Sequence, residues 1–115
     1  MKNNSIYPQI KIVNSTISQD TLPFFISEVG SNHQGSVDHC KKLMLAFKEA
    51  GASAVKLQKR FNKTFYSKNL YDEKYNNPNS YAETYGEHRE LLDFNKEQWQ
   101  AVSPTILSLF PEEKV

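Results

Sequence analysis

The feature that most constrains the fold is a strand–helix–strand pattern in residues 23–58. Two apolar runs of strand length, "PFFISEV" (Pro23 to Val29) and "ASAVKLQ" (Ala52 to Gln58), flank a stretch with helical periodicity. The apolar residues of that stretch make one stripe: Val37, Cys40, Leu43, Met44, Phe47 and Ala50. Because the connections are short, the pattern predicts a βαβ unit whose strands are parallel and joined in the right-handed sense.

The ends of this helix carry their own signals. Ser36 can cap the first turn through its hydroxyl, and Gly51 stands where a left-handed residue ends a helix. Upstream, the β-branched run "IKIV" (Ile10 to Val13) is followed by turn residues, which predicts a small β-hairpin with a neighbouring segment. The expected class is α/β, preceded by this short N-terminal β-hairpin.

Residues 59–95 show no strong periodicity and hold five of the six tyrosines of the chain. A connection of this length is uncommon in a compact domain and is usually functional or disordered. Disordered segments are poor in aromatic residues, so the tyrosines favour a loop that orders over a substrate site.

A further helix is expected to begin after Asn95. The Asn95 side chain can cap its first turn, and the Gln98 side chain can bond to the Asn95 backbone N–H in return, which makes a capping box. Trp99 and Val102 begin an apolar face. Pro104 follows after barely two turns and lacks the N–H that a helix interior needs, so we expect the helix to end there.

Polar side chains stand near the ends of both predicted strands. By strand alternation, Glu28 shares a face with the apolar residues before it, and Lys56 and Gln58 share a face of the second strand. If Val55 and Leu57 face the helix, all three polar residues lie on the opposite side. Ligands bind at the C-terminal ends of parallel strands, but an ion pair that only fills a polar interior explains Glu28 and Lys56 equally well.

The composition excludes several classes. The net charge of +1, without runs of like charge, does not indicate a nucleic-acid or membrane surface. The single cysteine cannot form an internal disulfide, and the N-terminal residues read as neither a signal peptide nor a membrane span, so a cytoplasmic location is expected. His33, His39 and His88 lack metal-ligand spacing; His33 is predicted to bond backbone in a turn and His39 to lie on a solvated helix face. The G-x-G-x-x-G fingerprint is absent.

Three stretches in order, "FFISEVGSNHQG", "EAGASAVKLQ" and "TYGEHRELLDF", resemble the sialic acid synthase (N-acetylneuraminate synthase) family. The resemblance covers roughly Ile10 to Gln100. It implies a TIM (β/α)8 barrel and a transferase of carbohydrate biosynthesis that condenses phosphoenolpyruvate with an N-acetylated aminosugar such as N-acetylmannosamine. The product is a nine-carbon sialic acid.

The resemblance also implies roles for four residues. Glu28 is similar to the acid/base carboxylate near phosphoenolpyruvate, and Lys56 to a cation that binds the anionic groups of that substrate. Gln58 is similar to a sugar contact. Asn32, together with His33, is implied to shape the substrate-binding loop after the first strand.

The departures from the family are equally informative. A TIM barrel needs about 250 residues, and this chain of 115 residues supplies the first two βα units, so the barrel is incomplete. The family's divalent metal (Mn or Mg) is implied to bind histidines of later strands, and no segment here matches them. The parent is implied to be a homodimer, and we do not expect these 115 residues to include the family's small C-terminal antifreeze-like domain.

We expect residues 1–100 to be the N-terminal part of such a synthase and residues 101–115 to be a divergent tail, which translation out of frame would explain. The fragment alone is expected to be inactive. The alternative is a non-catalytic degenerate remnant or a small α/β interaction module. The sequence does not tell which aminosugar the parent uses.

Overall fold

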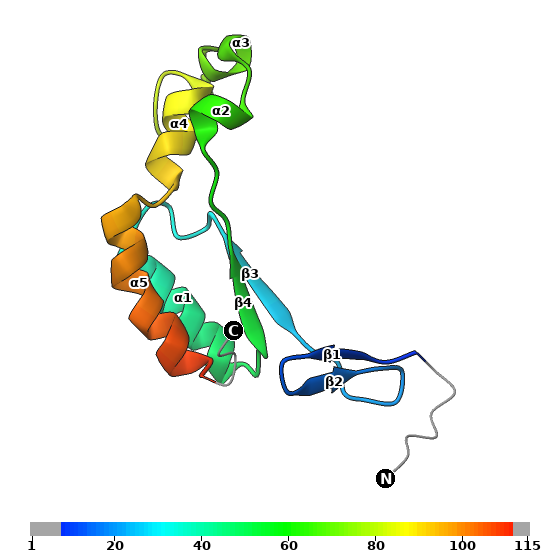
Figure 1. Cartoon of the computed structure of the whole chain (residues 1–115). Coiled ribbons are helices and arrows are strands. Elements are labelled where there is room, and N and C mark those ends of the chain that lie inside the picture. Colours follow the sequence, from blue (N-terminus) through cyan, green and yellow to red (C-terminus); the bar gives the residue numbers. More distant parts are fainter. Residues whose placement is uncertain (1–7, 112–115) are drawn as a thin grey trace.

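The structure is a computed structural model and describes residues 8–111. Figure 1 shows its helices and strands along the chain. In order they are β1 (Ile10–Ile12), β2 (Ser15–Ile17), β3 (Ile26–Gly30), α1 (Val37–Glu49), β4 (Ala54–Leu57), α2 (Asn62–Phe65), α3 (Lys68–Tyr71), α4 (Tyr85–Leu92) and α5 (Lys96–Leu109). The fold is α/β, and the described residues form no closed barrel.

The predicted strand, helix and strand are present as β3, α1 and β4. β3 and β4 pair in parallel, with Glu28 opposite Lys56, and a bulge follows at Val29. The Ser36 hydroxyl accepts a hydrogen bond from His39 N–H at 3.1 Å, and Gly51 has a φ of +99° just past the end of α1. The predicted cap residues of α1 are therefore confirmed.

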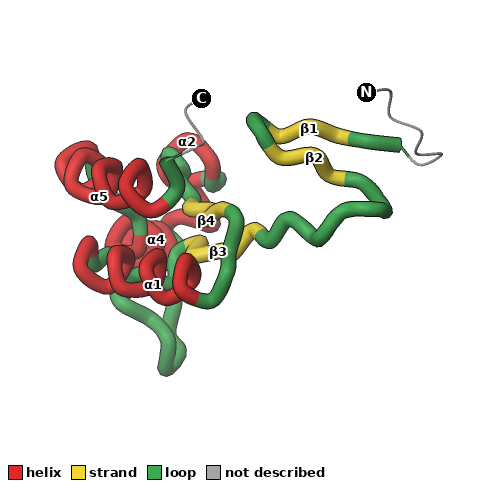
Figure 2. The backbone as a smooth tube through the Cα atoms, turned by 90° about the horizontal axis from the view of Figure 1, so that it is seen from below, coloured by secondary structure: helices red, strands yellow, loops and turns green. Residues whose placement is uncertain are grey.

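The N-terminal hairpin is also confirmed, since β1 pairs with β2 in antiparallel register. It contacts none of the other described helices or strands. Figures 1 and 2 both show it set apart from the remaining elements.

The core is small and lies where α1 meets the sheet and α5. Its fully buried members are Val29, Cys40, Met44, Phe94 and Val102. Val55 and Leu57 pack against this cluster, as the strand alternation predicts. One face of the β3–β4 pair is therefore covered by α1, while no described helix covers the opposite face (Figure 1).

The prediction that the last helix ends at Pro104 is wrong. α5 begins with the expected capping box between Asn95 and Gln98 but continues to Leu109 with Pro104 inside it. Val102 is buried, and Ile106 and Leu109 pack against the same cluster as α1. A proline inside a helix costs about 3 kcal/mol, and we attribute the tolerance to this packing against α1.

The segment 59–95, expected to be a loop that orders over a site, is ordered but contains regular structure. Three helices, α2, α3 and α4, occupy much of the segment. Thr84 caps α4 by accepting from Glu87 N–H at 3.2 Å, and the Tyr71 ring packs so closely on Gly86 that a Cβ there would overlap it. The contact between Tyr71 and Gly86 joins residues far apart in the sequence and leaves no periodic signal, whereas the Thr84 cap is a local signal.

Candidate functional site

Glu28 and Lys56 form an ion pair on the uncovered face of the sheet. Lys56 Nζ lies 3.0 Å from Glu28 Oε1, and the side chains are 56% and 63% exposed for Lys56 and Glu28 respectively. Their backbones pair directly across β3 and β4, close to the C-terminal ends of both strands. The predicted juxtaposition of these two residues is confirmed; their chemical roles stay predictions.

Gln58 and Asn32 both lie next to Gly30, which ends β3 with a φ of +56°. A Cβ at Gly30 would stand 3.9 Å from Gln58 Oε1 and 4.0 Å from Asn32 Nδ2. Asn32 Nδ2 donates to Val29 O at 3.0 Å, which fixes the first turn of the loop after β3.

His33 holds the rest of the loop in place. It is 1% exposed, its Nδ1 accepts from Gly35 N–H at 3.0 Å, and its ring stacks on Phe94 at 3.9 Å between centroids. Burial lowers the pKa of His33, although the charge of Asp93 opposes this shift. The neutral ring can keep Nδ1 as an acceptor. The prediction that His33 bonds backbone in a turn is confirmed, and His39 is exposed as expected.

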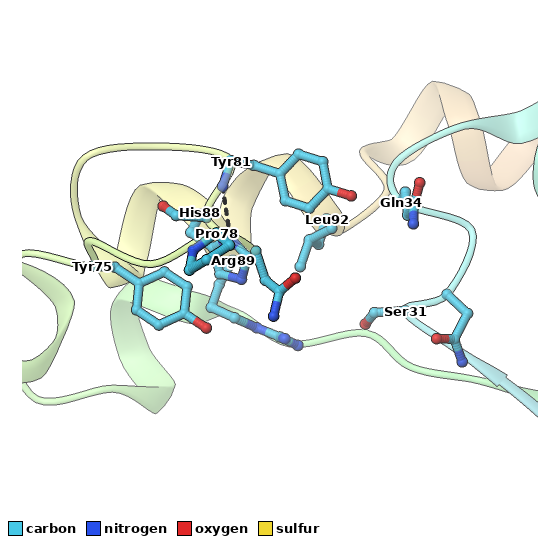
Figure 3. A pocket seen from close by; sticks show the side chains of 11 residues that line it. Ser31, Gln34, Tyr75, Pro78, Tyr81, His88, Arg89 and Leu92 are labelled. Carbon is cyan, nitrogen blue, oxygen red and sulfur yellow. Dashed lines mark hydrogen bonds between the residues drawn. The ribbon is translucent and has the colours of Figure 1, made fainter.

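A pocket of about 510 Å³ opens beside this loop. Figure 3 shows side chains from the loop after β3, from the segment before α4 and from α4 itself around it. Its lining residues are Ser31, Asn32, Gln34, Tyr75, Pro78, Asn79, Ser80, Tyr81, His88, Arg89 and Leu92. Of the four predicted site residues, Asn32 is the one in this lining.

His88 and Arg89 give the pocket its electrostatic character. His88 Nδ1 accepts from Tyr81 N–H at 3.1 Å, and burial, followed by the charge of Arg89, lowers the pKa of His88. Arg89 Nε is buried without a hydrogen-bond partner. His88 is thus favoured as a neutral ring beside the guanidinium of Arg89.

Tyr75 and Tyr81 belong to the tyrosine-rich segment that the sequence predicts to order over a substrate site, but the sequence does not predict Arg89 as a site residue. Arg89 lies inside "TYGEHRELLDF", one of the three stretches that resemble the sialic acid synthase family. The position of residues 59–95 indicates a binding site, because they directly follow β4. Segments after the C-terminal ends of parallel strands tend to build the binding site.

The residues that the structure describes contain no candidate metal site. Within residues 8–111, no three side chains of His, Cys, Asp or Glu come together in a way that could hold an ion. These residues therefore do not fit the divalent metal that the resemblance implies, and its location stays a prediction. In the same range, no helix is long and apolar enough to cross a membrane.

Comparison with known families matches residues 43–107 to the NeuB family. The match covers more than half of the chain and includes the second half of α1, all of β4 and of the pocket helix α4, and most of α5. It continues past Gln100, the expected limit of the resemblance. The chain belongs to the NeuB family.

Individual relatives agree with this assignment. The chain is 38% identical over 76 residues to N-acetylneuraminate-9-phosphate synthase of Drosophila melanogaster, covering 66% of this chain and 20% of that protein. It is 35% identical over 77 residues to the synthase of that name from Homo sapiens, covering 67% and 21%. It is 46% identical over 48 residues to the spore coat polysaccharide biosynthesis protein SpsE of Bacillus subtilis, covering 42% and 13%. The chain spans about a fifth of the length of the synthases that it matches.

Proposed function

We propose that this chain is the N-terminal part of a sialic acid synthase, with β3, α1, β4 and α5 supplying the first two βα units of its TIM barrel. The parent enzyme condenses phosphoenolpyruvate with N-acetylmannosamine or a related N-acetylated aminosugar. One observation carries the proposal: a NeuB-family chain holds Glu28 and Lys56 3.0 Å apart near the C-terminal ends of two parallel strands.

The chemistry of the substrates explains why this pair is useful. Phosphoenolpyruvate brings a carboxylate and a phosphate, so a fixed cation such as Lys56 favours its binding. Carbon 3 of phosphoenolpyruvate attacks the aldehyde carbon of the sugar, and water then adds at carbon 2 before phosphate leaves. Glu28, already within hydrogen-bonding distance of Lys56, moves protons during these steps.

Gln58 and Asn32 are proposed to contact the sugar, because both amide groups lie beside Gly30 at the end of β3, and Asn32 also lines the pocket. The Drosophila and human relatives are named for a 9-phosphate product. In a nine-carbon product built from three carbons of phosphoenolpyruvate and six of the sugar, carbon 9 is carbon 6 of the sugar. A phosphorylated aminosugar therefore falls within the proposal.

A chimera tests the proposal directly. Residues 23–110 of this chain would replace the matching segment of the Drosophila synthase, and product would be measured with phosphoenolpyruvate and N-acetylmannosamine 6-phosphate. We expect an active chimera that Glu28→Gln and Lys56→Met each slow by about a hundredfold or more. The matched controls are Glu49→Gln and Lys42→Met, which change exposed residues of α1 and should leave the rate unchanged.

The same experiment distinguishes the proposed function from the alternatives in which this chain has no catalytic role. If the ion pair only occupies a polar interior, Glu28→Gln and Lys56→Met would leave the chimera about as active as the controls do. A chimera that folds but has no activity even with both residues intact would favour a degenerate remnant or interaction module. Either result contradicts the proposed function.

A further inference from the structure

The loop after β3, residues 31–35, has a backbone conformation that needs support from outside the loop. Gln34 has a φ of +56°, in the left-handed region that residues other than glycine rarely adopt. Hydrogen bonds within the loop, such as Gln34 N–H to Ser31 O at 3.1 Å, close its turns but do not fix its direction relative to the helices. An unfavourable conformation of this kind persists where surrounding residues hold it in place.

The corner between α4 and α5 supplies this support. A Cβ on Gly35 would overlap the Leu91 carbonyl, so the loop backbone directly contacts the end of α4. The His33 ring stacks on Phe94 at 3.9 Å between centroids. Gln98 Nε2, from the first turn of α5, donates to Gly35 O at 3.1 Å. Figure 1 shows the loop passing beside the start of α5.

Gln98 makes two hydrogen bonds that need two different atoms of its side chain. Its Oε1 accepts from Asn95 N–H at 2.9 Å, which completes the capping box of α5. Its Nε2 donates to Gly35 O, 63 positions earlier in the chain. A capping box takes glutamine or glutamate at this position, but a glutamate carboxylate has no N–H to donate. The cap alone therefore does not require an amide, whereas the contact with Gly35 does.

We propose that Gln98 is a positioning residue of the synthase: through Gly35 it holds the loop after β3 so that Asn32 meets the aminosugar. This inference rests on the proposed function, because that function gives Asn32 a sugar to contact. Asn32 lines the 510 Å³ pocket and Gln98 does not, so Gln98 acts through the loop. The bond to Asn95 N–H holds the Gln98 side chain in the orientation that reaches Gly35, which fixes the loop relative to the start of α5.

Kinetics of the chimera that carries residues 23–110 in the Drosophila synthase test this role, since every contact named above lies within the inserted segment. The Gln98→Glu variant keeps an acceptor for Asn95 N–H and loses the donor to Gly35 O. We expect KM for N-acetylmannosamine 6-phosphate to rise about tenfold, while kcat and KM for phosphoenolpyruvate change less than about twofold. The melting temperature should stay unchanged, because the cap is retained.

The matched control is Asn95→Ala. It removes the Oδ1 that accepts from Gln98 N–H at 2.8 Å, and it leaves the backbone N–H that orients the Gln98 side chain. This variant should lower the melting temperature and leave KM for the sugar unchanged. A rise of that KM in Asn95→Ala as large as in Gln98→Glu would overturn the proposal, because the stability of α5 would then account for both.

Hydrogen exchange followed by mass spectrometry measures the loop without relying on activity. In the Gln98→Glu chimera, we expect the amides of residues 31–36 to exchange about tenfold faster than in the parent chimera, while those of α5 exchange as before. Unchanged exchange of the loop overturns the proposal. Faster exchange with an unchanged KM for the sugar also overturns it, because the contact then has a structural role alone.

The two measurements keep this inference separate from the proposed function. A chimera that folds but makes no product contradicts the proposed function. In that chimera the exchange of residues 31–36 still decides whether Gln98 holds the loop: faster exchange in Gln98→Glu supports this, and unchanged exchange overturns it. An active chimera whose sugar KM is the same with and without Gln98→Glu supports the proposed function and overturns the role of Gln98.

Discussion

At the scale of single residues, Glu28 and Lys56 contribute little to holding the fold together. Both side chains are more than half exposed, and exposed ion pairs contribute about 0–1 kcal/mol. Their position is nevertheless fixed, because strand alternation and the parallel register bring them opposite each other. An ion pair that is well placed but adds little stability is more easily explained by substrate binding than by folding.

The titration of His33 and His88 should make the free energy of unfolding depend on pH. Burial lowers the pKa of both, so the folded chain keeps them neutral at pH values where the unfolded chain protonates them. The two neutral rings therefore contribute fully to the free energy of unfolding above about pH 6.5, the ordinary pKa of histidine in an unfolded chain. This contribution is lost as the pH falls toward the lower pKa values that the two residues have in the folded chain.

We expect the helical signal in far-UV circular dichroism to melt at a lower urea concentration at about pH 5.5 than at about pH 7.5. The variant with both His33→Asn and His88→Asn should show a smaller difference, because the Asn oxygen can replace Nδ1 as acceptor and does not titrate. His39→Asn, at an exposed position, is the matched control. An unchanged pH dependence in the double variant would contradict this reading.

At the scale of helices and strands, the sequence predicts the helix caps and the β3–α1–β4 unit, but not the packing of α5 or the pocket. The caps at Ser36 and Asn95 depend on residues three positions apart, so the sequence predicts them directly. The continuation of α5 through Pro104 depends on packing against α1, which no local pattern reveals. The pocket around Arg89 likewise joins residues 31–34 with residues 75–92, which meet only in the folded chain.

Pro104 offers a test of how α5 is held. Replacing it with alanine removes the clash inside the helix and restores an N–H that can reach the Gln100 carbonyl. Because Pro104 is exposed, we expect Pro104→Ala to stabilise α5 by up to about 3 kcal/mol and to raise the helical signal of the chain. Ser108→Ala, at another exposed position of the helix, is the control. A loss of helical signal in Pro104→Ala would contradict the claim that Pro104 destabilises α5.

At the scale of the whole molecule, the described residues make an elongated structure. The radius of gyration is 18.3 Å and the longest extent is 59 Å, whereas a compact chain of similar length has a radius of about 13 Å. The two-stranded parallel sheet has one uncovered face, and Ile26 on that face is 53% exposed. Both outer edges of this sheet are unpaired in the described structure, which favours association with other chains.

We therefore expect the isolated chain to be aggregated, oligomeric or only partly folded. Its small core is unlike the layered interior of a barrel, and limited apolar burial offsets backbone entropy poorly. Size-exclusion chromatography and thermal unfolding would measure this. A monodisperse monomer with a sharp cooperative transition would show that the chain is an independent domain and would strengthen the interaction-module alternative.

The most direct measurement of the central claim is a synthase assay of the isolated chain beside the chimera. Both would be incubated with manganese, phosphoenolpyruvate and either N-acetylmannosamine or its 6-phosphate, and sialic acid would be measured after phosphatase treatment. If the chain supplies only one part of an active site, it makes no product above the no-enzyme control, while the chimera does. Product formed by the isolated chain and lost in its Glu28→Gln variant would contradict the account, because the chain would then hold a complete site of its own.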